Sequence, residues 1–161
     1  MSNDNTRIIS RREYTDHRYI LYFENNEKLS VDEETYLKNS WYELEELTEE
    51  QYDKILFDSQ SYEAYRKAVN YLTYGKKTKN RIVTYLVQKG YDYKISRHAA
   101  ELLESQGKID DDQFISVFIS KNMKNGITRD KLIAKLIYHG ISMEKAIKEV
   151  DKVIKTNEDT Y

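Results

Sequence analysis

The fold is decided by residues 78–90, TKNRIVTYLVQKG, because a related stretch follows fifty residues later. The second stretch is residues 128–140, TRDKLIAKLIYHG, and the two share a first Thr, a ninth Leu and a final Gly. Thr is a common residue at helix N-caps, and Gly is favoured just after a helix C-terminus. The sequence therefore predicts one helix that occurs twice, in two tandem copies of a helical unit.

Further helices extend each copy into a three-helix unit. Apolar residues at helical spacing predict helices over 61–74 and 92–106, on either side of the first stretch. In the second copy, Asp110 and Ser142 are the expected N-caps of the corresponding helices. We therefore expect repeat 1 at 61–109, repeat 2 at 110–155 and a flexible tail at 156–161.

The apolar positions of both copies are expected to form the helical cores. In the repeated helix these are Ile82, Val83, Leu86 and Val87 in the first copy, and Leu132, Ile133, Leu136 and Ile137 in the second. Leu102, Val117 and Ile147 in the flanking helices are also expected to face inward.

Residues 1–60 predict a different kind of module. Two runs rich in β-branched and aromatic residues, 7–14 and 17–23, flank a break at Asp16 and predict a hairpin. A lone hairpin is marginal in water, so it must pack on something. The fold class is therefore mainly α, with tandem three-helix repeats preceded by a small strand-containing N-terminal module.

Two capping boxes predict short helices within this module. Ser30-Val-Asp-Glu33 predicts a helix over 31–39, since its Ser and Glu side chains can each bond a free backbone N–H. Thr48-Glu-Glu-Gln51 predicts a second helix that ends near Phe57, after which Ser61 begins the next.

The composition excludes several classes of protein. The 161 residues include no Cys, so disulfides and thiolate metal sites are excluded. No run approaches the roughly 18 to 20 apolar residues of a membrane span, and MSNDNTRIIS at the start is unlike a signal peptide. We therefore expect a cytoplasmic protein without a membrane partner.

Charge is distributed unevenly along the chain. Residues 1–60 hold 7 Lys and Arg against 15 Asp and Glu, whereas residues 61–161 hold 19 against 13. Within residues 61–100 there are 9 basic and 2 acidic residues. Such asymmetry informs about partners rather than about fold.

The basic excess defines a candidate site for binding a partner or a nucleic acid. Its residues are Arg66, Lys67, Tyr74, Lys76, Lys77, Lys79 and Arg81. The cations can meet phosphates or an acidic protein groove, although lysines and arginines also simply solvate exposed helix faces. Aromatic residues among cations can stack on bases, but at helical spacing they can equally be core. Both interpretations stay open for Tyr74, whereas Tyr71 is expected in the core.

Catalytic and metal-binding patterns are missing from the sequence. The three histidines, at 17, 98 and 139, show no metal spacing, and there is no Gly-rich phosphate loop or HExxH motif. The acidic runs at 43–50 and 110–112 are better explained by helix capping than by a cation. We expect no enzyme activity, no cofactor and no metal.

The ordered elements of residues 60–154 resemble the RecX family, the small bacterial regulators of the RecA recombinase. The resemblance rests on AVNYLTY at 68–74, RIVTYLVQKGY at 81–91, LLESQGKIDDDQF at 102–114, KNG at 124–126 and LIAKLIYHGI at 132–141. Family members commonly have three three-helix units, whereas this chain has two, and their basic character is here confined to residues 61–100.

The resemblance implies a regulatory protein that binds RecA or the RecA–DNA filament and inhibits its recombinase, ATPase and coprotease activities without catalysis. Single-stranded DNA is a further candidate partner. One alternative is a stand-alone helical nucleic-acid-binding module without RecA, and another is a structural adaptor whose acidic N-terminal module covers the basic face. The sequence leaves the oligomeric state open.

Overall fold

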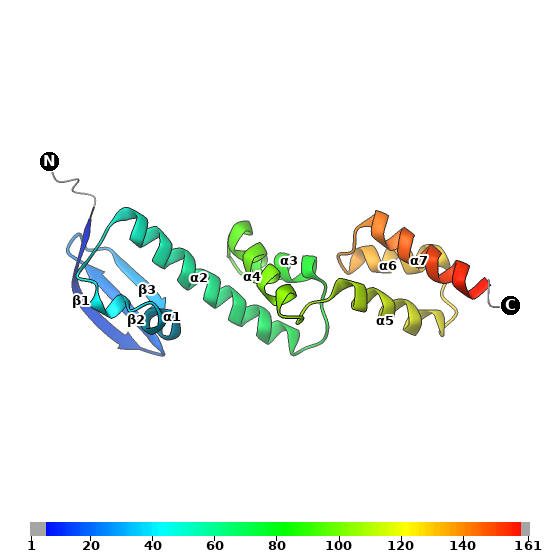
Figure 1. Ribbon diagram of the computed structural model, residues 1–161, viewed down its shortest axis with the longest axis horizontal. Helices are drawn as coiled ribbons and strands as arrows, with labels where there is room; N and C mark the ends of the chain where they lie inside the picture. The colour runs from blue at the N-terminus through cyan, green and yellow to red at the C-terminus, as the bar shows by residue number, and fades with distance from the viewer. Residues whose placement is uncertain (1–5, 159–161) are drawn as a thin grey trace. The chain divides into compact units, whose positions relative to one another are not determined.

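The computed structural model describes residues 6–158, and the chain divides into two compact units, Met1–Arg66 and Lys67–Tyr161 (Figure 1). The long helix α2, Glu49–Leu72, contributes residues to both units. It runs through the predicted boundary between residues 60 and 61. The predicted division into a module, two repeats and a tail therefore stays a prediction.

The first unit contains a four-stranded antiparallel sheet. Its strands are β1 (Arg7–Thr15), β2 (Arg18–Phe23), β3 (Lys28–Asp32) and β4 (Glu46–Leu47), in the order β3-β2-β1-β4. The hairpin predicted around Asp16 is confirmed, because β1 and β2 pair with Thr15 opposite Arg18. Asp16 and His17 form its turn with φ of 49° and 62°, the left-handed conformation that suits a two-residue hairpin.

The first helix of this unit begins two residues later than the sequence predicts. Ser30 was the expected N-cap, but it lies in β3 opposite Ile20, so strand pairing takes this residue. Asp32 caps α1 (Glu33–Lys38) instead, and its carboxylate accepts a hydrogen bond of 2.8 Å from the Thr35 backbone N–H. A short 3₁₀ helix, Trp41–Glu43, leads on to β4.

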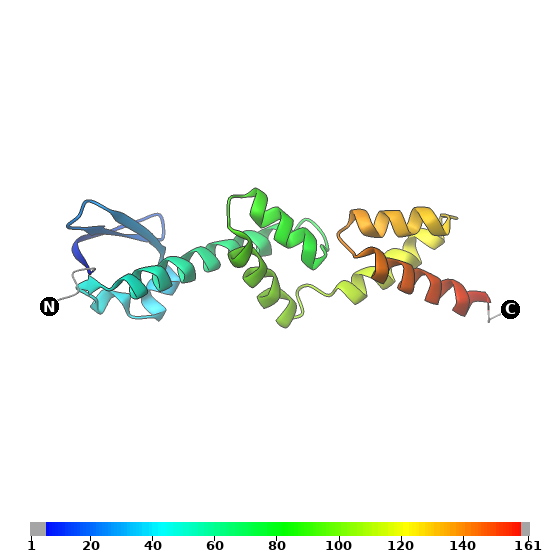
Figure 2. The same ribbon diagram turned by 90° about the horizontal axis from the view of Figure 1, so that it is seen from above.

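The core of the first unit lies between the sheet and its helices. Figure 2 shows α1 and the start of α2 on the same face of the sheet. Leu21 and Val31 from the sheet, Tyr36 from α1 and Ile55 from α2 are all at most 2% exposed and belong to one apolar cluster. Burial of this face supplies what an isolated hairpin lacks.

The helix α2 is one uninterrupted helix, so the predicted end near Phe57 and new start at Ser61 are wrong. Neither Gly nor Pro occurs in this segment to break the helix. Ser59 is buried and its hydroxyl accepts from the Asp32 backbone N–H at 3.2 Å. The capping box at the start of α2 is confirmed, with reciprocal bonds of 2.9 and 3.1 Å between Thr48 and Gln51.

As far as the structure describes the second unit, to Glu158, its regular elements are all helices. After the end of α2 come α3 (Lys79–Gln88), α4 (Tyr93–Ser105), α5 (Asp111–Met123), α6 (Arg129–Tyr138) and α7 (Met143–Glu158). The end of α2 with α3 and α4 forms repeat 1, and α5, α6 and α7 form repeat 2 (Figure 1). The predicted fold class, tandem three-helix repeats after a strand-containing module, is confirmed.

The two repeats begin and bury their helices in the same way. Thr78 caps α3 and Thr128 caps α6, each accepting a hydrogen bond from the backbone N–H three residues on. Leu86 and its counterpart Leu136 are both fully buried. The predicted caps Asp110 and Ser142 are also present.

Some apolar positions expected in the core are exposed. These are Val87, Leu102, Val117, Ile137 and Ile147, between 37% and 51% exposed. Val87 and Ile137 are equivalent positions, so both copies of the repeated helix bury a narrower stripe than their apolar sequence indicates. At the C-terminus, α7 continues through Glu158, so residues 156–158 of the predicted tail are helical, while 159–161 lie outside the described residues.

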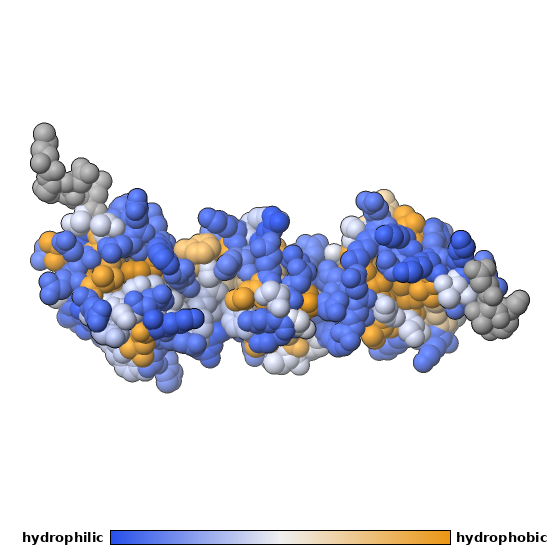
Figure 3. Space-filling view, in the orientation of Figure 1, coloured by the Kyte–Doolittle hydropathy of each residue, from blue (hydrophilic) through white to orange (hydrophobic). Residues whose placement is uncertain are grey.

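Hydrophilic residues predominate on the face of the molecule shown in Figure 3, with apolar patches between them. None of the helices in the part of the chain that the structure describes is long and apolar enough to cross a membrane.

Candidate functional site

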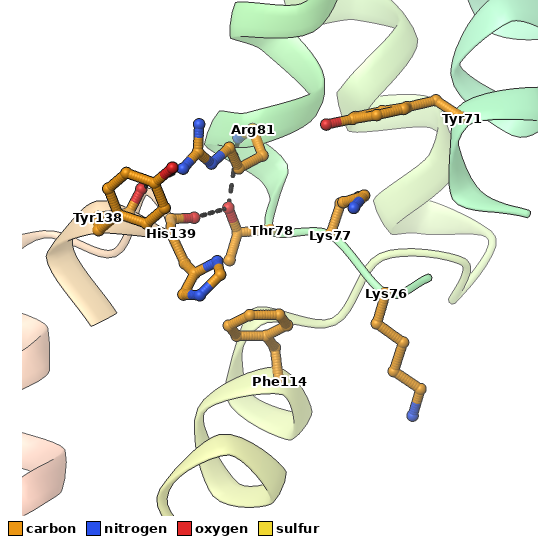
Figure 4. Close-up of a pocket in the computed structure, with 8 residues that line it drawn as sticks. All are labelled: Tyr71, Lys76, Lys77, Thr78, Arg81, Phe114, Tyr138 and His139. Carbon is orange, nitrogen blue, oxygen red and sulfur yellow. Dashed lines mark hydrogen bonds between the residues drawn. The ribbon is translucent and has the colours of Figure 1, made fainter. Parts of the chain in front are cut away.

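A basic cleft lies within the second unit, where repeat 1 meets repeat 2 (Figure 4). Its volume is about 260 Å³, and it is lined by Tyr71, Lys76, Lys77, Thr78, Arg81, Phe114, Tyr138 and His139. Three of these residues are cations, and none of the described lining residues is acidic. We call this feature the basic cleft.

Thr78 lies where repeat 1 meets repeat 2, and its side chain makes two hydrogen bonds. Its hydroxyl oxygen accepts from the Arg81 backbone N–H at 3.3 Å, which caps α3. The same hydroxyl donates to the backbone carbonyl of His139 at 2.5 Å. The last backbone carbonyls of a helix accept no hydrogen bond from within that helix. The Thr78 hydroxyl supplies the missing donor to one of these carbonyls, that of His139 at the end of α6. The side chain is fully buried.

Arg81 is used at the same junction. Its Nη2 atom donates a hydrogen bond of 2.6 Å to the backbone carbonyl of Tyr138, and its guanidinium lies 4.6 Å from the centre of the Tyr138 ring. A cation at a helix C-terminus is favoured by the helix dipole. Arg81 therefore joins the repeats and holds the Tyr138 side chain, in addition to lining the cleft.

Lys79 is paired beside the cleft rather than pointing into it. Its backbone N–H donates to Asp111 Oδ1 at 2.9 Å, and its Nζ atom forms an ion pair of 3.2 Å with Glu104. Its charge is therefore less available to a partner than the sequence alone indicates.

Gly140 allows the repeats to approach closely. A Cβ atom built on it would lie 2.9 Å from Thr78 Oγ1 and 3.1 Å from Asn80 Cβ, distances that real Cβ atoms rarely or never show. Its φ of 93° is also in the region that favours glycine. The equivalent Gly90 has a φ of 103° but nothing within 4 Å of a built Cβ. Only Gly140 is therefore required by packing as well as by backbone conformation.

Lys76 and Lys77 are cations of the cleft that pair with no carboxylate in the described part of the chain, and the same holds for Arg81, which bonds a backbone carbonyl instead. Among the ion pairs of residues 6–158, none involves either lysine. The Lys77 ammonium lies 4.9 Å from the centre of the Tyr71 ring, which itself stacks on Tyr85 at 3.9 Å. Lys76 is exposed, and Figure 4 shows its side chain extending away from Thr78.

The pKa of His139 reflects the positive charge of the basic cleft. Its ring contacts Phe114 and Phe118 with centroids 5.5 and 5.1 Å apart, and the side chain is partly buried. Burial lowers the pKa of His139, and the charges of Arg81, Lys77 and Lys135 lower it further. Burial and the nearby cations both disfavour the protonated imidazolium. The effect of the cations indicates a positive electrostatic potential in the basic cleft.

The remaining predicted site residues lie outside the cleft lining. Arg66 and Lys67 are exposed on α2, where their cationic groups lie 5.9 Å from the Tyr62 ring and 5.2 Å from the Tyr91 ring, respectively. Tyr74 follows the end of α2 and is 77% exposed. The structure thus places Lys76, Lys77 and Arg81 in the lining of one cleft, and the other predicted residues are not part of that lining.

The sequence reasoning missed the contribution of the second repeat to this site. Tyr138 and His139 stand where the first copy has Gln88 and Lys89. The two copies were compared only at the positions where they are alike, so the difference at these two positions was not considered. The replacement of a polar pair by two aromatic rings was the signal that could have found them.

The fold and the cleft define a class of protein: tandem three-helix repeats behind a strand-containing module, with a cationic cleft where the repeats meet. No protein-family model matches the chain. Curated relatives do match, and three of them carry the name Regulatory protein RecX. The relative from Streptococcus uberis is 30% identical over 137 residues, which is 83% of this chain and 53% of the relative.

Two further relatives of that name give similar matches. The one from Lactobacillus johnsonii is 28% identical over 138 residues, covering 83% of this chain and 51% of the relative. The one from Halalkalibacterium halodurans is 28% identical over 135 residues, covering 81% and 50%. The chain thus spans about half the length of the curated relatives it matches.

A crystal structure of a regulatory protein RecX has the same fold. The match has a TM-score of 0.63 and 22% sequence identity, and it covers 92% of this chain and 74% of the other. The resemblance to the RecX family that the sequence indicates is thereby confirmed.

Proposed function

We propose that this chain is a regulatory protein that binds RecA or the RecA–DNA filament and inhibits its activities. The single observation that carries the proposal is the basic cleft, in a chain that resembles the RecX family. Lys76 and Lys77 are placed there without a carboxylate partner among the described residues. Unneutralised cations in a hollow favour an anionic partner.

The filament is a suitable partner on electrostatic grounds. DNA carries a phosphate at each nucleotide, and cationic side chains that replace its counterions gain affinity that depends on salt. The proposed function therefore places Lys76 and Lys77 against the filament. It needs no reacting group, since the chain acts by occupying a binding surface.

The structure changes which residues a test should alter. Substituting Arg81 would remove a bond that joins the repeats, and substituting Lys79 would remove its ion pair with Glu104, so loss of binding in either variant would be ambiguous. The double variant Lys76→Ala/Lys77→Ala removes two charges without removing those hydrogen bonds. Lys121→Ala/Lys124→Ala is a charge-matched control, because these lysines border a different cleft on α5.

Association with preformed RecA filaments on single-stranded DNA tests the proposal directly. The unaltered chain and the Lys121/Lys124 control are expected to sediment with the filaments, and the Lys76/Lys77 variant is expected to stay largely in solution. Equal sedimentation of all three proteins would contradict the proposed surface, and absence of any association would contradict the proposed partner.

The alternative is a helical nucleic-acid-binding module that acts without RecA. The observation that favours it is the pair of exposed rings near the cations, with Tyr74 77% and Tyr138 73% exposed. Aromatic rings among cations are typical of single-strand binding. This alternative requires binding to DNA in low salt together with unchanged RecA activity.

A further inference from the structure

We propose that the basic cleft binds single-stranded nucleic acid, with a backbone phosphate held by Lys76 and Lys77 and a neighbouring base stacked on Tyr138. The inference rests on the proposed function in taking the DNA strand of the filament as the ligand. It names the ligand class and adds Tyr138, from the second repeat, to the binding residues.

The phosphate position follows from the arrangement of charge. Lys76 and Lys77 come from the turn before α3, and Arg81 from its first turn, so all three cations line one hollow, with Lys76 extending away from Thr78 and the Arg81 guanidinium turned to Tyr138 (Figure 4). Arg81 is already bonded to the end of α6, which leaves the two lysines to meet an incoming anion. A phosphodiester would give these lysines the negative partner that the described lining residues do not supply.

The base position follows from how Tyr138 is held. Its ring is 73% exposed, yet the Arg81 guanidinium lies 4.6 Å from its centre, and its backbone carbonyl accepts a bond from the same side chain. Figure 4 shows Tyr138 and Arg81 on one side of Thr78 and the two lysines on the other. An exposed ring that already contacts a cation offers a stacking surface for a base beside the lysines.

An acidic protein segment explains fewer of these features. Carboxylates would be satisfied by the lysines alone and would gain nothing from an exposed aromatic ring held in place. Nucleic acid uses both, because each nucleotide brings a negative phosphate and a flat base. The observations therefore favour a single strand, and an acidic peptide becomes an outcome that the test can detect.

Fluorescence anisotropy with a labelled oligothymidylate, without RecA, measures the lysine contribution. Lys76→Ala/Lys77→Ala should weaken binding about tenfold or more in low salt and reduce the slope of log K against log salt by about 1.4, since each phosphate contact on a single strand contributes about 0.7. Lys121→Ala/Lys124→Ala should change the slope by much less. Equal slopes in the two variants would overturn the proposal.

Substitution of Tyr138 measures the stacking contribution. Tyr138→Ala should weaken binding about tenfold, whereas Tyr138→Phe should bind like the unaltered chain, because stacking of one base needs the ring and not its hydroxyl. Neither change removes the backbone carbonyl that Arg81 bonds. Equal affinity of the Ala and Phe variants would remove Tyr138 from the site.

His139 provides a readout that needs no variant. A phosphate in the cleft would offset the positive charges of Arg81 and Lys77, so the pKa of the His139 ring, followed by NMR, should rise when the oligonucleotide binds. Saturating binding that leaves His139 unchanged would overturn the site, and a response to poly-glutamate but not to oligonucleotide would assign the cleft to an acidic protein.

Failure of this inference can be told apart from failure of the proposed function. Restraint of RecA without any oligonucleotide binding would overturn the nucleic-acid site and leave the regulatory function standing. Oligonucleotide binding that shows all the predicted changes, with RecA unaffected, would support the site and overturn the RecA role.

Discussion

The hydroxyl of Thr78 donates a hydrogen bond to the backbone carbonyl of His139, 61 residues further along the chain. Thr78 begins the helix of the first copy, and His139 ends the helix of the second. The residues that open and close the repeated element therefore contact each other across the two repeats. The shape of the basic cleft depends on this contact, since both residues line it.

Replacement of Thr78 should therefore cost more stability than replacement of its counterpart. Thr78→Val keeps the shape of the side chain but removes the cap of α3 and leaves the His139 carbonyl without its donor. We expect a loss of about 1 to 3 kcal/mol in the free energy of unfolding, measured by urea denaturation. Thr128 is exposed and serves only as a cap, so Thr128→Val should cost about 1 kcal/mol. Equal losses would show that the bond to His139 contributes little.

The two glycines that end the repeated helix form a second matched pair. Gly90→Ala and Gly140→Ala both place a side chain at a positive φ, which costs on the order of 1 kcal/mol. Only the second also forces a Cβ to within 2.9 Å of Thr78 Oγ1, so the repeats must shift, at a further cost of about 1 to 3 kcal/mol. Thermal unfolding of both variants checks the difference. A Gly90 variant as unstable as the Gly140 variant would contradict the close packing of the repeats.

The lowered pKa of His139 predicts a pH dependence of stability. The unfolded side chain, with an ordinary value of 6.5, takes up a proton at higher pH than the folded one. As the pH falls below 6.5, protonation favours the unfolded state, and stability is lost until the pH has passed the folded pKa. Urea denaturation at about pH 7.5 and about pH 5.5 should show this loss.

The assignment to His139 is checked by a variant in the same pH range. His139→Gln should reduce the loss of stability between the two pH values, because the titrating ring is gone while the backbone carbonyl remains. An identical pH dependence in the unaltered chain and the His139 variant would contradict the burial of this ring.

The helical repeats could be read from the sequence because their signals are local. Caps such as Thr78 and Asp110 and the buried positions Leu86 and Leu136 follow from short-range pattern, and the structure has them as expected. The error at Ser61 has a physical reason: a serine can cap a helix or lie inside one, and only its surroundings decide.

The cleft was only partly predictable, because three of its eight lining residues, Phe114, Tyr138 and His139, come from the second repeat. Lys76 and Lys77 stood out as an uncompensated basic turn. Tyr138 lies in the same cleft only because the two repeats pack against each other. No local sequence pattern specifies that packing. The same junction explains why Arg81 is committed to bonds within the protein, although its charge in the sequence resembles that of the lysines.

The proposed regulatory function is tested most directly by the DNA-dependent ATP hydrolysis of RecA in the presence of this protein. The unaltered chain, at amounts below that of RecA, should slow hydrolysis, and so should the Lys121→Ala/Lys124→Ala control. The Lys76→Ala/Lys77→Ala variant should leave hydrolysis close to its uninhibited rate. Unchanged hydrolysis with the unaltered chain would contradict the regulation of RecA, and equal inhibition by all three proteins would contradict the cleft as the acting surface.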